Sequence, residues 1–87
     1  MNRLAKYKLC GNLNATVSGK MLYLILIDIA DDNGRVIIPQ RRISETLGIS
    51  KAAVSRNLRH LRDGGYIGID AQYTDFGSRA PNKYRIL

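Results

Sequence analysis

The sequence predicts an α+β fold in which a three-helix core carries a small antiparallel β-sheet. Two short amphipathic helices are expected on either side of Gly48, within residues 40–62. Two segments that alternate between apolar and polar residues follow, within residues 66–87. A run of seven apolar residues, 21–27, precedes both and can fill the centre of a core. The length of 87 residues suits one domain, and we expect a single domain over residues 1–87.

The first element after an N-terminal extension, residues 1–16, is the apolar segment 21–30. If it is a helix, Ser18 is the expected N-cap. As a helix it places Leu22, Ile25, Leu26 and Ile29 on one side and Tyr23, Ile27 and Ala30 on another, and one of these sides is expected to pack on the helices that follow. The β-branched content also permits a strand, and periodicity does not decide between the two. A helix that is apolar all round is normally buried, so its second side needs the extension, a second copy of the chain or another domain to cover it.

A turn and a short strand are predicted next. Asp31-Asp32-Asn33-Gly34 is a strong turn signal, and the β-branched run 36–38 follows it. Pro39 ends this run, because proline has no N–H to donate to a sheet and its fixed φ suits the start of a helix. The run is expected as a third strand beside a later hairpin.

Residues 40–62 have the pattern of two helices joined by a tight turn. Ile43 and Leu47 lie four apart and give the first helix one apolar edge. Gly48 stands where a helix ends on a left-handed residue, which glycine adopts without steric cost. Ser50 is the expected N-cap of the second helix, since its hydroxyl can accept from a free N–H of the first turn. The pattern is typical of a helix-turn-helix, in which the second helix enters the DNA major groove.

The second of these helices separates an apolar side from a basic side. Val54, Leu58 and Leu61 fall at i, i+4 and i+7 and are expected to face the core. The opposite side carries Ala52, Arg56, Arg59 and, near its far end, Asp63. Small residues let the backbone approach the bases, and guanidinium groups pair with guanine through two donors. Because residues 51–62 hold four cations and no acidic residue, with Asp63 alone following them, an ordinary solvated face is the weaker interpretation.

The end of the chain predicts a β-hairpin within residues 66–87. Asp63-Gly64-Gly65 is a helix stop, and either glycine can take the left-handed cap. Residues 66–71 alternate with period two, and residues 83–87 alternate again after a loop of turn-forming residues over 74–82. The expected order is therefore helix, short strand, helix, turn, helix and hairpin.

The segment ISETLGISKAAVSRNLRHLRDGGYI, residues 43–67, resembles the winged helix-turn-helix domains of bacterial regulators of the MarR, Lrp and Crp kind. The resemblance implies a winged helix-turn-helix fold and DNA binding as a transcriptional regulator. It implies that the groove-facing positions are Ser50, Lys51, Ala52, Ser55, Arg56 and Arg59. It also implies that the wing tip, with Arg79 and nearby Lys83, reaches a minor groove or a phosphate. Pro39 departs from the pattern, since many relatives carry a serine or threonine cap there.

The charge distribution favours an anionic partner, for which we expect double-stranded DNA read sequence-specifically. The net charge is +7. Residues 1–34 hold four basic and three acidic residues, and residues 35–87 hold ten and four, so the net charges are +1 and +6. The residues expected to hold phosphates are Arg41, Arg42, Arg62, Arg79 and Lys83. An anionic membrane fits less well, because the sequence has no long basic amphipathic helix.

The sequence does not indicate a metal site, a disulfide, a catalytic site or a membrane span. A lone Cys10 with a lone His60 favours neither a metal site nor an internal disulfide. No nucleophile or orienting acid marks His60 as catalytic, so we expect no enzyme activity, no cofactor and no small-molecule ligand. The N-terminus lacks the apolar core of a signal peptide, and the run 21–27 is too short to span a membrane. We therefore expect a cytoplasmic protein.

Three further questions stay open at the level of sequence. The basic face can instead dock an acidic protein, as in a winged-helix interaction module. The chain can also be the DNA-binding head of a longer replication initiator or mobile-element protein. The sequence favours a homodimer through the N-terminal segment and the helix at 21–30 no more and no less than a monomer. RNA is less favoured, since the five tyrosines and Phe76 do not cluster as a stacking platform.

Overall fold

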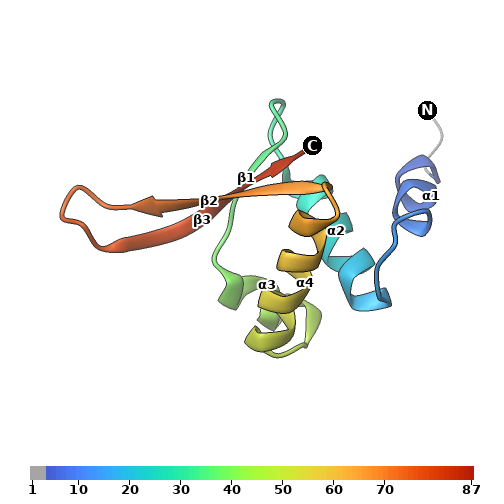
Figure 1. The fold of residues 1–87 in the computed structure, drawn as a ribbon, viewed down its shortest axis with the longest axis horizontal. Helices are drawn as coiled ribbons and strands as arrows, with labels where there is room; N and C mark the ends of the chain where they lie inside the picture. Colours follow the sequence, from blue (N-terminus) through green and yellow to red (C-terminus); the bar gives the residue numbers. More distant parts are fainter. Residues whose placement is uncertain (1–3) are drawn as a thin grey trace.

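The computed structural model describes residues 4–87. Their elements are α1 (Ala5–Gly11), α2 (Val17–Ile29), β1 (Arg35–Ile37), α3 (Gln40–Leu47), α4 (Lys51–Asp63), β2 (Ile67–Tyr73) and β3 (Arg79–Ile86). Figure 1 shows α2, α3 and α4 gathered at one end of the sheet, with α1 beside α2 and the β2–β3 hairpin projecting away from the helices. The molecule measures 44 × 28 × 23 Å, and the hairpin lies along the longest axis. The predicted α+β winged helix-turn-helix fold is confirmed.

The three strands form an antiparallel sheet in the order β1-β3-β2. Tyr84 is the central residue of the sheet, with Val36 opposite it on β1 and Ile69 opposite it on β2. Tyr84 and Val36 are buried against the helices. Because successive side chains of a strand point to opposite faces, Lys83 and Arg85 lie on the outer face of the sheet. The predicted third strand is confirmed, one residue earlier than expected.

The hairpin strands run further than the sequence predicted. A loop was expected as far as Asn82, but β3 begins at Arg79. The register shifts by one residue along the way, because Pro81 and Asn82 together lie opposite Ala71 in a bulge. A bulge tolerates proline, which cannot donate to the sheet, and the side-chain amide of Gln72 donates to the Pro81 carbonyl over 3.0 Å. The bulge thus carries the strand through a segment that looks like a loop in the sequence.

The apolar segment is a helix, α2, and two details differ from expectation. Its N-cap is Thr16 rather than Ser18, since the Thr16 hydroxyl accepts from Gly19 N over 3.1 Å. Its buried residues are Gly19, Leu22, Tyr23 and Leu26. Ile29, on the same predicted side as Leu22 and Leu26, is 50% exposed. The buried residues therefore come from both predicted sides, Leu22 and Leu26 from one and Tyr23 from the other, and the Tyr23 ring packs edge-on against Tyr66 with 6.0 Å between centroids.

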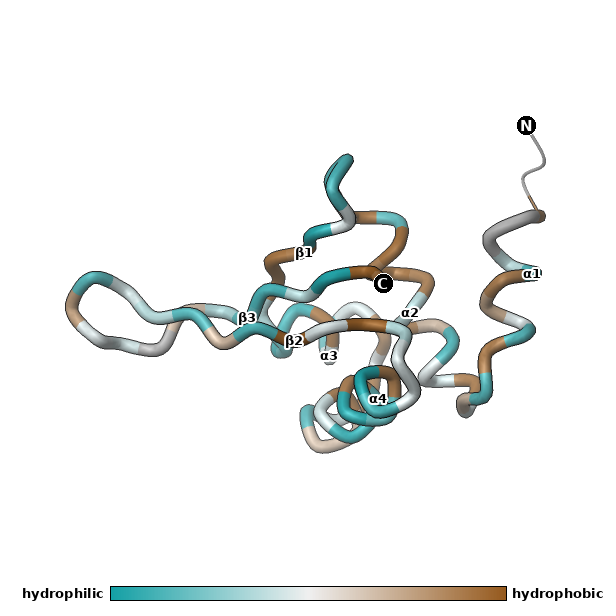
Figure 2. The backbone as a smooth tube through the Cα atoms, turned by 45° about the horizontal axis from the view of Figure 1, so that its top comes forward, coloured by the Kyte–Doolittle hydropathy of each residue, from teal (hydrophilic) through white to brown (hydrophobic). Residues whose placement is uncertain are grey.

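The N-terminal extension contains a helix, α1, that the sequence did not predict. Figure 2 shows α1 alternating between hydrophobic and hydrophilic residues along its length. Cys10 and Leu13 are 6% and 5% exposed and join the core cluster of α2. The extension therefore covers part of the second side of α2. Within the described residues, no helix combines the length and the apolar character that crossing a membrane requires.

Candidate nucleic-acid interface

Local hydrogen bonds fix the turn between α3 and α4. Gly48 has φ = 67°, and its N–H donates to the Ser44 carbonyl over 2.9 Å. The Ser44 hydroxyl in turn donates to the Ile49 carbonyl over 2.6 Å. Ser50 then caps α4, since its hydroxyl accepts from Ala53 N over 3.0 Å. Both predicted cap residues are confirmed, and they set where the second helix starts.

The inner side of α4 anchors it to the core. Val54, Leu58 and Leu61 are each at most 1% exposed, as the helical spacing predicted. Asn57 lies on the same side and is 5% exposed, and sequence reasoning missed it. The signal was available, because Asn57 stands three residues after Val54, inside the apolar stripe. At the far end Gly65, with φ = 82°, takes the left-handed cap.

The outer side of α4 is open to solvent. Its residues, which we call the α4 outer face, are Lys51, Ala52, Ser55, Arg56 and Arg59. All are exposed except Ser55, which is half-buried. In the described part of the chain, Lys51, Arg56 and Arg59 make no side-chain ion pair or hydrogen bond. No described residue therefore neutralises these charges, and the guanidinium groups can donate to another surface.

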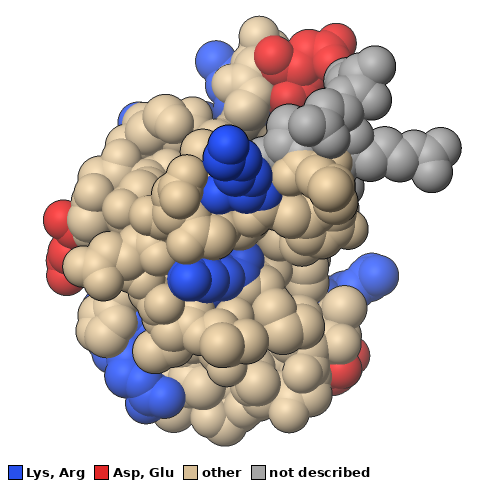
Figure 3. Space-filling view, turned by 90° about the vertical axis from the view of Figure 1, so that its right-hand side faces the viewer, with Lys and Arg blue, Asp and Glu red and all other residues tan. Residues whose placement is uncertain are grey.

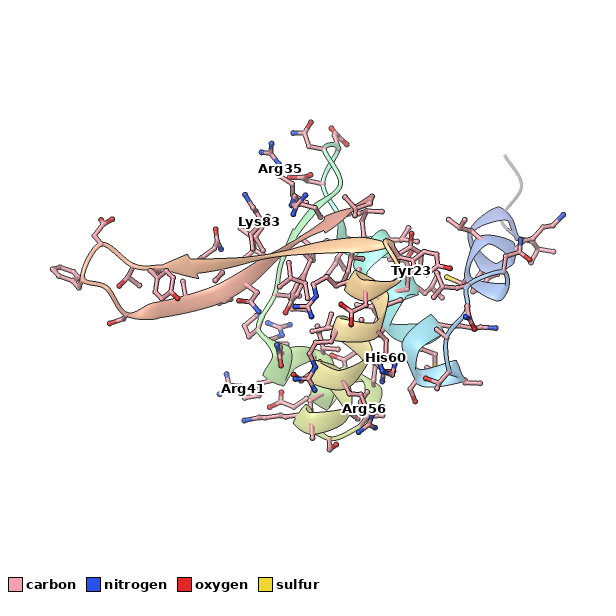
Figure 4. All side chains as sticks on the ribbon, in the orientation of Figure 1. Tyr23, Arg35, Arg41, Arg56, His60 and Lys83 are labelled. Atoms are coloured by element: carbon pink, nitrogen blue, oxygen red, sulfur yellow. The ribbon has the colours of Figure 1, made fainter. Side chains whose placement is uncertain are left out.

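Further cations flank this face. Arg41 and Arg42 are exposed in the first turn of α3, and Figure 4 shows Arg41 and Arg56 projecting from the same end of the helical core. Arg41 Nε lies 3.8 Å from a Glu45 carboxylate oxygen, but both side chains are more than two-thirds exposed, so the pair holds Arg41 weakly. Arg62 Nε lies 3.2 Å from the carboxylate of Asp63, at the end of α4. Arg41, Arg42 and Arg62 are thus exposed cations on the two helices of the helix-turn-helix.

The two predicted wing cations lie apart from that face. Lys83 is in the middle of β3 on the outer face of the sheet, and Figure 4 shows it and Arg35 projecting away from α3 and α4. Arg79 opens β3 opposite Tyr73, near the tip of the hairpin. The side chain of Arg79 lies outside the described part of the structure. The structure therefore does not bring Lys83 together with Arg56 and Arg59.

Carboxylates on the sheet side are engaged within the molecule. Arg85 Nε donates to Asp70 over 2.7 Å, and this hydrogen bond lowers the pKa of Asp70. Gly68 leaves the room for it, because a Cβ at Gly68 would overlap the Arg85 guanidinium. Backbone N–H groups of Arg35 and Asn33 donate to Asp31 and lower its pKa, the Arg35 bond having the larger effect. These carboxylates hold the sheet and the turn before it, and they lie away from the α4 outer face.

No catalytic arrangement stands out among the described residues. His60 is exposed on the flank of α4. Cys10 is a buried residue of α1. In residues 4–87, no three side chains of His, Cys, Asp or Glu come together as a potential metal site. The candidate site is therefore the basic surface of α3 and α4.

Comparisons with known proteins bear on the same segment. Residues 16–67, from the cap of α2 to the first residue of β2, match the family model of a helix-turn-helix domain. A solved structure named "Possible transcriptional regulator from Methanosarcina mazei Go1" aligns over 94% of this chain with a TM-score of 0.66 and 20% sequence identity. The chain spans 62% of the length of that protein, and the likeness is one of fold. Among curated protein sequences, none matches significantly.

Proposed function

The chain belongs to the helix-turn-helix domain family, and from this premise we propose that it binds double-stranded DNA sequence-specifically, as a bacterial transcriptional regulator. The observation that carries the proposal is the α4 outer face. This face is exposed, it carries a small side chain at Ala52, and its arginines have no partner among the described residues. A recognition helix needs all three properties, since it must approach the base edges closely and offer them free donors. We propose a binding role without a cofactor rather than catalysis.

In the proposed complex, α4 lies in the major groove. Arg56 and Arg59 contact base edges, and guanine is the favoured base because its O6 and N7 accept from one guanidinium. Residues at the groove edges are Ser50, Lys51 and Ser55. Phosphate contacts come from Arg41, Arg42 and Arg62. Arg79 and Lys83 meet phosphates only where the wing itself reaches the duplex, since they lie apart from α4.

Selection from a pool of random duplexes tests the proposal directly. We expect one motif to be enriched, and we expect binding to it to exceed binding to an unrelated duplex by at least about a thousandfold. The bound stoichiometry gives the number of chains per site. A pool that shows no enrichment, with weak binding even at low salt, would favour a module that docks an acidic protein instead.

A phosphate contact has a characteristic salt signature. Replacing Arg42 by alanine is expected to weaken binding to all duplexes similarly and to reduce the slope of log K against log salt by about 0.9, because one fewer phosphate is neutralised. Arg35→Ala is the matched control, since Arg35 is an exposed cation on the other side of the molecule. Equal slopes for the parent and Arg42→Ala would remove Arg42 from the interface.

We also propose a homodimer through α1 and α2. Val17 and Met21 lie four apart on α2 and are 75% and 49% exposed, and Leu4 and Leu9 are exposed at α1. Figure 3 shows that most of the surface on the α1 side is neither acidic nor basic. Because each chain is strongly basic, two chains that associate through a mostly uncharged side experience less electrostatic repulsion than two that associate through a basic side. A dimer would read two half-sites about 34 Å apart.

A single charge on this side tests the dimer. Val17→Glu is expected to convert a dimer to a monomer, since two carboxylates would be desolvated on association, while a glutamate in the first turn of α2 suits the helix dipole and preserves the fold. Sedimentation equilibrium measures the mass. Ile37→Glu, on the exposed side of β1, is the control. A parent that stays monomeric at high concentration contradicts the proposal.

A further inference from the structure

A partly buried polar contact joins α4 to the start of α2, between the buried Asn57 and the exposed Thr16. Among the described residues, Asn57 is the polar side chain that the core buries. The Thr16 hydroxyl donates to the Asn57 carbonyl oxygen over 3.3 Å, and the same hydroxyl accepts from Gly19 N. Gly19 permits this approach, since a Cβ there would lie only 3.3 Å from the Asn57 oxygen. One side chain of α4 is therefore tied to the N-cap of α2.

This contact is directional, whereas its neighbours are not. Val54, Leu58 and Leu61 bury apolar surface, and apolar burial has little preference for orientation. A hydrogen bond, by contrast, weakens steeply once its distance and angle depart from the optimum. The Thr16–Asn57 contact, at 3.3 Å between its two oxygens, thus adds a directional constraint to an otherwise apolar interface, and this constraint favours one rotation of α4 about its own axis.

The rotation of α4 decides where its arginines point. Each helical residue advances about 100°, so Arg56 and Arg59 lie on the side opposite the core while Asn57, between them in sequence, points inward. Turning a helix by about 20° moves groups at its 5–6 Å outer radius by roughly 2 Å. A bidentate contact with guanine does not survive such a displacement, because both donors must align with O6 and N7. A phosphate contact, which depends mainly on charge, does survive it.

We propose that Asn57 is a positioning residue that sets sequence discrimination without touching DNA. It holds α4, through Thr16, at the rotation in which Arg56 and Arg59 meet base edges. The proposal rests on the proposed DNA-binding function. A leucine at position 57 would continue the apolar stripe and avoid the cost of burying an amide. The presence of asparagine there is therefore better explained by its selecting one rotation of α4 than by a gain in stability.

Asn57→Leu tests this role, with affinities measured for the duplex selected by the parent and for an unrelated duplex of equal length. We expect the variant to fold, to bind the unrelated duplex within twofold of the parent, and to bind the selected duplex about tenfold more weakly. Thr16→Ser keeps both the cap and the hydroxyl donor and is expected to retain the parent's ratio of the two affinities. Ile67→Val, a mild core change in β2, is expected to lower stability without changing that ratio.

A measurement without DNA separates this proposal from the proposed function. In the free protein, Asn57→Leu should change the nuclear Overhauser contacts between the side chains of α4 and those of α2, and Thr16→Ser should leave these contacts in place. An unchanged affinity ratio for Asn57→Leu, or unchanged contacts between α4 and α2, would overturn the positioning role. If the parent itself does not distinguish duplexes, the proposed function fails, and the contacts between α4 and α2 alone decide whether Asn57 sets the rotation of α4.

Discussion

Replacing Arg56 by alanine is expected to weaken binding to the selected duplex by about 1–3 kcal/mol and to relax the base preference at one position. Arg56 is exposed in the middle of α4 and makes no ion pair within the described chain, so its removal leaves the fold unchanged. The loss arises because a bidentate contact to one base disappears. Titrations with the selected duplex and with duplexes altered at single positions measure both effects.

Arg56→Lys separates recognition from charge. Lysine keeps the positive charge but lacks the planar fork of donors, so the salt slope should stay constant while base preference falls. If Arg56→Ala binds the selected duplex as tightly as the parent, Arg56 does not read a base. If Arg56→Lys behaves like the parent in every titration, Arg56 acts through charge alone.

Replacing Leu26 by alanine is expected to lower the free energy of unfolding by about 2–5 kcal/mol. Leu26 is fully buried in α2, where the helix meets the core cluster, and its truncation removes apolar contacts and leaves a cavity. Small domains have little stability to spare, so much of the variant should be unfolded at 37 °C. Urea denaturation followed by circular dichroism measures the change.

Ile29→Ala is the matched control on the same helix. Ile29 is half exposed, so its truncation removes little buried surface and should cost well under half as much as Leu26→Ala. Equal losses for the two variants would mean that Ile29 lies in the core beside Leu26, contrary to the structure. The pair therefore tests the orientation of α2 as well as its burial.

Features governed by local chemistry were predictable from the sequence. Gly48 and Ser50 fix the turn between α3 and α4 through bonds to residues within four positions, so their roles follow from residue type and spacing. The burial of Val54, Leu58 and Leu61 follows from helical periodicity. Solvent exposure of Arg56 and Arg59 follows from the same periodicity.

Features that depend on distant partners were not predictable. Thr16, and not the expected Ser18, caps α2. The Thr16 hydroxyl also contacts Asn57, which lies 41 residues away in the sequence. The buried side of α2 includes Tyr23, which packs against Tyr66 in another long-range contact. Lys83 was expected with Arg79 near the wing tip, but the register of β3 places it on the outer face of the sheet. Periodicity carries no information about such pairings.

The bulge opposite Ala71 divides the wing into two mechanically different halves. On the near side, β3 has β1 and β2 as neighbours, and beyond it β2 alone. The tip closes on itself, since Thr74 and Ser78 exchange backbone and side-chain bonds around the fully solvated Phe76. Insertions at the tip are therefore tolerated by the helices. A fluorophore or an epitope attached there would track the approach of the molecule to other surfaces without perturbing its interior.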